Sequence, residues 1–160
     1  MTTQTIAAIS AAYIEMLEIQ SGIFNNAFEK INDQEALLRP NDQVNHINWL
    51  LGHIVTCRFM LFNLLGGNES DRYFNLYFKA INENAKYVSL EEIMTQWNKI
   101  TKLLICRVES ITDEEMNNII PGKDGRPKDF LSFFIYHEAY HLGQIGYARK
   151  YLGLGVLKSN

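Results

Sequence analysis

The sequence lacks the features that mark several large classes of protein. It has two cysteines and three prolines in 160 residues, and its 15 basic side chains are outnumbered by 18 acidic ones. No apolar run approaches the roughly 20 residues that span a bilayer, and residues 1–4 (MTTQ) open no secretory signal. These absences argue against a disulfide scaffold, a membrane anchor and a nucleic-acid-binding surface. We therefore expect a cytoplasmic protein with free thiols.

Apolar side chains recur at the three- and four-residue spacing of buried helix faces. This periodicity predicts four long helices, over about residues 4–32, 42–65, 90–111 and 128–152. The aromatic-rich segment 70–84 predicts one further short helix, and no segment alternates as a strand does. No linker or repeat divides the chain, so residues 1–160 are expected to form a single domain. The sequence predicts an all-α four-helix bundle with a short extra helix.

The histidines lie on these apolar rows. His137 and His141 are four residues apart, which places both imidazoles on one face of the last helix. His46 and His53 share a row of the second helix. An unpaired buried polar group costs roughly 1 to 3 kcal/mol, and clustered imidazoles are good ligands for zinc and neighbouring divalent metals. The pattern predicts a metal site that joins the last helix to a histidine of the second.

Residues 137–141 also match H-E-x-x-H, the zinc-peptidase motif in which the glutamate is the general base. Residues 142–160 contain no His, Asp or Glu to act as the third ligand that such peptidases take downstream. Glu138 and His141 have the spacing of a di-iron bundle, but no other glutamate has a histidine three residues later. The motif therefore favours a single metal ion whose third ligand lies upstream, with Glu138 as a candidate catalytic residue.

Two segments resemble the metal-binding segments of the DinB/YfiT-like metalloenzyme superfamily. They are residues 48–53 (NWLLGH) and residues 136–145 (YHEAYHLGQI). The resemblance implies a four-helix bundle of up-down-down-up connectivity, frequent dimerisation, and one metal held by a histidine of the second helix and two of the last.

Carried over by position, the resemblance selects His53 over His46 and completes the ligand set with His137 and His141. Gln144 is similar to the family's trailing glutamine, which makes it a second candidate catalytic residue that orders a metal-bound water or braces a ligand. Cys57, one turn beyond His53, is either a core side chain or a fourth ligand.

The resemblance also implies a function. Its characterised members include thiol S-transferases, so we expect a metal-dependent transferase that uses a low-molecular-weight thiol cosubstrate, a small-molecule substrate, and zinc or nickel as the ion. A homodimer is expected, with no nucleic-acid or membrane partner. Two alternatives stay open: a hydrolase in which Glu138 or Gln144 handles a metal-bound water, and a non-catalytic, stress-associated bundle. A metal whose four coordination positions are all filled by protein ligands, including Cys57, would favour the non-catalytic bundle.

Overall fold

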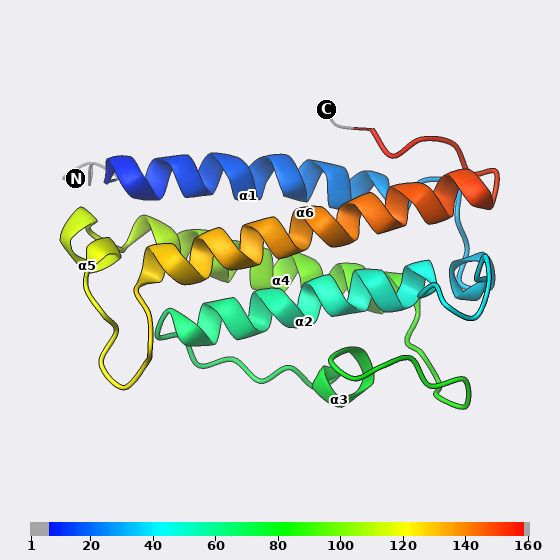
Figure 1. Cartoon of the computed structure of the whole chain (residues 1–160), viewed down its shortest axis with the longest axis horizontal. Coiled ribbons are helices and arrows are strands. Elements are labelled where there is room, and N and C mark those ends of the chain that lie inside the picture. Colours follow the sequence, from blue (N-terminus) through cyan, green and yellow to red (C-terminus); the bar gives the residue numbers. More distant parts are fainter. Residues whose placement is uncertain (1–6, 159–160) are drawn as a thin grey trace.

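Four long helices form the structure, a computed structural model that describes residues 7–158 (Figure 1). They are α1 (Ala8–Asn26), α2 (Ile47–Leu64), α4 (Leu90–Glu109) and α6 (Pro127–Tyr151). The connections contain the short helices η1 (Glu35–Leu37), α3 (Phe74–Tyr77) and α5 (Asp113–Asn117). The described residues contain no strand, which confirms the all-α bundle.

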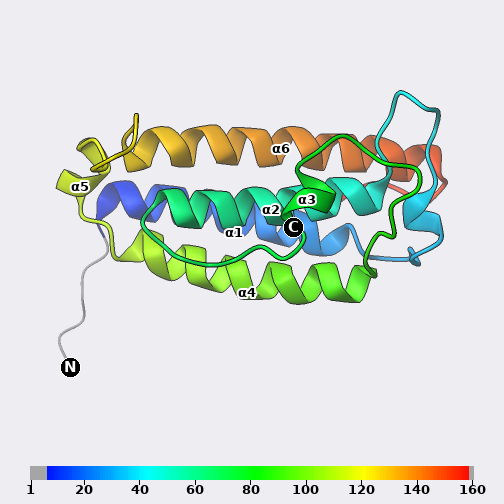
Figure 2. The ribbon, with the colours of Figure 1, turned by 90° about the horizontal axis from the view of Figure 1, so that it is seen from below.

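The directions of the long helices can be followed in two views. In Figures 1 and 2, α1 and α6 run toward one end of the molecule, and α2 and α4 run toward the other. The link from α2 to α4 therefore returns along the length of the bundle, and it carries α3 along the outer side of α2 (Figure 2). This return places α3 beside the middle of α2, where His53 lies.

The helix ends differ from the predicted ones where local backbone chemistry decides them. α1 ends at Asn26 rather than near residue 32, because residues 27–30 form turns and Lys30 has a left-handed φ of 55°. The predicted residues 4–6 of that helix lie outside the described part. α2 begins at Ile47 rather than residue 42, because the side chain of His46 caps it by accepting a hydrogen bond from Trp49 N.

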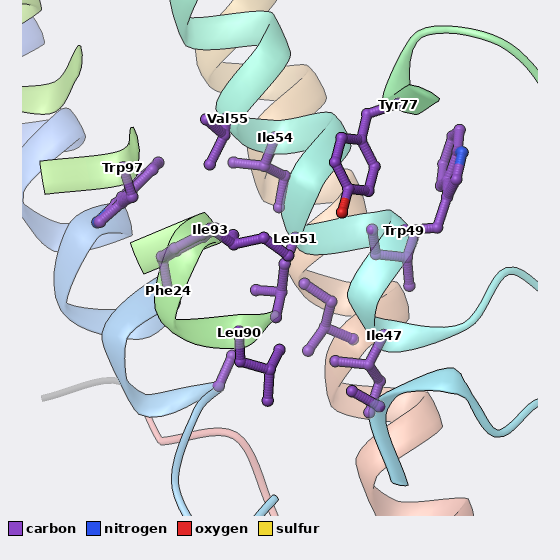
Figure 3. Close-up of a cluster of buried hydrophobic side chains, with 14 of the residues drawn as sticks. Phe24, Ile47, Trp49, Leu51, Ile54, Val55, Tyr77, Leu90, Ile93 and Trp97 are labelled. Carbon is purple, nitrogen blue, oxygen red and sulfur yellow. The ribbon is translucent and has the colours of Figure 1, made fainter. Parts of the chain in front are cut away.

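α2 is the central helix of the bundle. It packs against both α4 and α6, and most of its side chains are buried. By length and composition α2 could also cross a membrane, but 78% of it is buried within the bundle. In Figure 3, Trp97 and Phe24 lie on one side of α2, and Tyr77 and Trp49 lie on the other. The apolar surface of α2 is thus used by the protein's own core.

Candidate metal centre

The structure brings the three predicted ligands, His53 on α2 and His137 and His141 on α6, into mutual contact. The ring centroids lie 5.2 Å apart for His53 and His137, 4.7 Å for His53 and His141, and 4.4 Å for His137 and His141. His53 and His141 are buried, whereas His137 is half-buried. The cluster therefore bridges two helices and has one edge toward solvent.

The ring of His53 is oriented by backbone and aromatic contacts. Its Nδ1 lies 2.8 Å from the carbonyl oxygen of Tyr77, so Nδ1–H donates to that oxygen. The indole ring of Trp49 stacks on the imidazole with a centroid separation of 4.7 Å. The lone pair of the neutral ring is consequently on Nε2, which faces the other histidines and Cys57.

Gln144 orients the ring of His141 in a similar way. His141 Nδ1 lies 2.7 Å from Gln144 Oε1 and donates its hydrogen to it, and the Gln144 amide donates to Tyr140 Oη at 3.2 Å. The lone pair of His141 is thus on Nε2, which lies 3.1 Å from Nε2 of His137. Gln144 is placed to brace a ligand, one of the two roles predicted for it.

The separations between nitrogen atoms can be compared with those expected of a metal centre. Two nitrogen ligands at the usual zinc distance of about 2.0–2.1 Å are about 3.3 Å apart in a tetrahedral site. The observed 3.1 Å between the Nε2 atoms of His137 and His141 is close to that value. His137 Nδ1 is buried and has no hydrogen-bond partner within residues 7–158. The residues present therefore fit a divalent ion.

Burial keeps these imidazoles neutral. It lowers the pKa of His53 and of His137 below the ordinary 6.5, and it lowers that of His141 to about 4. Because an imidazole binds a metal only in its neutral form, all three rings are ready to act as ligands at neutral pH without losing a proton.

Cys57 also lies in this cluster. Potential ligand atoms of His53, Cys57 and His137 all lie within 4.8 Å of one another. The Cys57 side chain is buried, and burial together with the charge of Glu138 raises the pKa of its thiol to about 12. The cluster thus combines nitrogen and sulfur donors, a set compatible with binding a soft divalent ion.

Glu138 forms a buried ion pair with Arg58. Arg58 Nε donates to Glu138 Oε2 at 2.9 Å, and Arg58 Nη2 donates to Oε1 at 2.7 Å. The pair is almost fully buried. Both carboxylate oxygens are therefore occupied, and this geometry favours a structural role over the general-base role predicted from the motif.

Arg58, which no sequence pattern singled out, connects all four long helices. Besides Glu138 on α6, its guanidinium donates to Ser21 Oγ on α1 and to Thr101 Oγ1 on α4, and it stacks over Trp97. Arg58 lies four residues after Ile54 on the apolar row of α2. A basic residue at an inward position is a signal that could have pointed to a buried acidic partner.

His46, the alternative upstream histidine, lies apart from the cluster at the start of α2. Its Nδ1 accepts the hydrogen bond of Trp49 N at 2.9 Å, and its ring packs edge-on against Tyr87. A side chain used as a helix cap already has a partner for its lone pair. The structure therefore places His53, not His46, with the two histidines of α6.

The fold and the site together define a class of protein: a helical bundle with a buried histidine cluster, shared by its second and last long helices, that is compatible with a divalent metal. The sequence model of the DinB superfamily matches residues 16–145. The chain belongs to this superfamily. A comparison with curated proteins finds no match.

Proposed function

We propose that the protein is a cytoplasmic metal-dependent transferase that uses a low-molecular-weight thiol, with one zinc or nickel ion held by His53, His137 and His141. The observation that carries the proposal is the convergence of imidazole rings from α2 and α6, with the Nδ1 atoms of two of these rings already bonded to Tyr77 O and Gln144 Oε1. Such outer bonds fix the ring orientation that metal binding needs.

The charge of a divalent ion at this site would lower the pKa of a thiol so that it reacts as the thiolate at neutral pH. The side chains around the site provide aromatic surface for a substrate. Trp49 covers one face of His53, and the exposed rings of Phe133 and Tyr140 flank His137 and His141. Phe133 and Tyr140 are exposed and place aromatic surface beside the half-buried His137, which suits a small organic electrophile.

Thiol transfer is favoured over hydrolysis by the state of Glu138. The hydrolase alternative assigns Glu138 to take a proton from a metal-bound water, and both oxygens of Glu138 already accept hydrogen bonds from Arg58. A thiol is far more acidic than water, with a pKa near 8.5 for cysteine, so the positive charge of an ion is enough to ionise it. Gln144 is neutral and supports ligand orientation in either reaction.

The proposal is tested by loading the purified protein with zinc or nickel and measuring conjugation of small thiols to a chromogenic electrophile. We expect transfer above the uncatalysed rate for at least one thiol, and loss of that excess in His53→Ala and His141→Ala. His46→Asn is the matched control, because it replaces a histidine of the same helix outside the cluster. An excess rate that survives both alanine substitutions would contradict the proposal.

A further inference from the structure

The sulfur of Cys57 faces the same space as the histidine nitrogens. Cys57 lies one helical turn after His53 on α2, and Sγ is 3.6 Å from His53 Nε2. The thiol is free rather than in a disulfide, and its side chain is only 6% exposed. Nδ1 of His53 is bonded to the Tyr77 carbonyl, so the Cys57 sulfur lies next to the other ring nitrogen, Nε2.

The distance between the two atoms matches that of two ligands on one ion. A thiolate at about 2.3 Å and an imidazole nitrogen at about 2.05 Å from a tetrahedral zinc ion are about 3.6 Å apart. The observed separation of Cys57 Sγ and His53 Nε2 is 3.6 Å. Each of the two separations, one between nitrogens and one between nitrogen and sulfur, matches a pair of ligands on a tetrahedral ion. The two pairs are joined through His53, Cys57 and His137, whose potential ligand atoms all lie within 4.8 Å of one another.

We propose that Cys57 is the fourth ligand of the metal centre in the resting protein, in addition to His53, His137 and His141. This inference rests on the metal site of the proposed function and adds to it a sulfur ligand that closes the shell. Such a site is catalytic only if Cys57 gives up its position to the cosubstrate, and non-catalytic if it does not. A thiolate ligand selects ions that accept sulfur, such as zinc, over manganese and magnesium.

The closed shell has a consequence for the cosubstrate. A low-molecular-weight thiol that binds the ion would have to take the position of Cys57. The incoming thiol would lose its S–H proton, and Cys57 would leave as the neutral thiol that carries this proton. One sulfur ligand replaces another, so charge and oxidation state are unchanged.

Cobalt(II) provides a spectroscopic test that does not depend on activity. The metal-free protein is titrated with cobalt, and visible d–d bands report the ion while a near-ultraviolet sulfur-to-cobalt band reports a thiolate ligand. We expect both in the wild type and in Cys106→Ala, the control for the exposed second cysteine. In Cys57→Ala and Cys57→Ser we expect the d–d bands without the sulfur band.

Added 2-mercaptoethanol tests the exchange. It should restore a sulfur band in Cys57→Ala, because the vacated position accepts an external thiol. Cobalt that binds the wild type without a sulfur band would overturn the role of Cys57 and leave the three-histidine site intact. A sulfur band that survives in both Cys57 variants would also overturn it. Failure of the wild type to bind cobalt at all would overturn this inference and the metal site of the proposed function together.

Discussion

Arg58 and Glu138 show how a side chain within a catalytic motif can serve the fold. Arg58 is 1% exposed, and its nitrogens donate to Glu138, Ser21 and Thr101. A charge buried this deeply requires its partner, because an uncompensated buried ion is strongly destabilising. The link to α2 thus gives the glutamate of the H-E-x-x-H motif a structural role.

The first prediction concerns this ion pair. Glu138→Gln removes the negative charge and leaves Arg58 buried without a counterion, so the free energy of unfolding should fall by about 3–5 kcal/mol. Urea denaturation monitored by circular dichroism measures it. Arg58→Met should cost a similar amount, and combining it with Glu138→Leu should recover much of the loss. A Glu138→Gln protein of wild-type stability that has lost thiol-transfer activity would instead support the catalytic role.

The second prediction concerns His46 and pH. Burial, helped by the charge of Arg39, lowers the pKa of folded His46 to about 4 from the ordinary 6.5. Between these values the unfolded chain binds the proton more readily, so the contribution of His46 to stability is complete above pH 6.5 and is lost as the pH falls toward 4. His46→Asn keeps a capping acceptor but does not titrate.

The stability of metal-free wild type relative to metal-free His46→Asn should therefore decline from pH 7 to pH 4.5. Both proteins are unfolded in urea at several pH values. Because they share the other histidines, the contributions of those histidines to the pH dependence cancel in the difference. Parallel pH profiles for the two proteins would show that folding does not change the pKa of His46, and would contradict the prediction.

At the scale of elements, the junction of α2 with α3 determines the position of His53. Tyr77, the last residue of α3, accepts the His53 Nδ1 hydrogen at its carbonyl and donates its hydroxyl to Asn48 Oδ1 at 3.0 Å. Its ring lies directly over Gly52. The glycine before the histidine in the NWLLGH segment is therefore a site of close approach, which allows α3 to reach the ligand.

The third prediction follows from this contact. A Cβ at Gly52 would overlap the Tyr77 ring, so Gly52→Ala should lower the free energy of unfolding by about 1–3 kcal/mol and weaken metal binding by displacing the Tyr77 carbonyl. Gly143→Ala is the control, since its added Cβ has no atom within 4 Å apart from its chain neighbours and the nearby backbone of α6. It should stabilise α6 by about 0.5–1 kcal/mol. Thermal unfolding measures the stability of both variants, and zinc titration measures their metal affinity. Equal changes in Gly52→Ala and Gly143→Ala would contradict the prediction.

The elements differ in how well the sequence predicted them. α6 lies within one residue of its predicted range, because apolar spacing and a proline at its start both define it. The end of α1 and the start of α2 were predicted wrongly, because they depend on the backbone of Lys30 and on a histidine acting as a cap. Periodicity reports which face is buried, and it carries little information on where a helix stops.

Similar reasons explain what could be predicted of the site. His137 and His141 share a helix face by spacing alone, and the resemblance selected His53. The hydrogen bond between His53 and the Tyr77 carbonyl could not be predicted from the sequence. The carbonyl is a backbone atom in an aromatic-rich link, and no pattern in the sequence specifies the path of that link. The pairing of Arg58 with Glu138 was missed for a related reason: the residues are 80 positions apart, and only the packing of α2 on α6 brings them together.

At the scale of the whole molecule, the fourth prediction is the homodimer expected from the resemblance. An apolar groove of about 660 Å³ lies between α1 and α6 and is lined by residues that include Met16, Ile135 and Tyr136. Tyr136 is 71% exposed. We expect light scattering to give twice the mass of the chain, and Tyr136→Glu to shift it toward the monomer. A monomeric wild type at high concentration would contradict the dimer.

The central claim is that His53, His137 and His141 hold one divalent metal ion. Its most direct test is elemental analysis of the untagged protein, with His53→Ala and His141→Ala beside the wild type. We predict near one equivalent of zinc or nickel in the wild type, sharply lowered in both variants. A wild-type protein that contains no metal and cannot be loaded with any would contradict the claim, and the three histidines would then be side chains of the core.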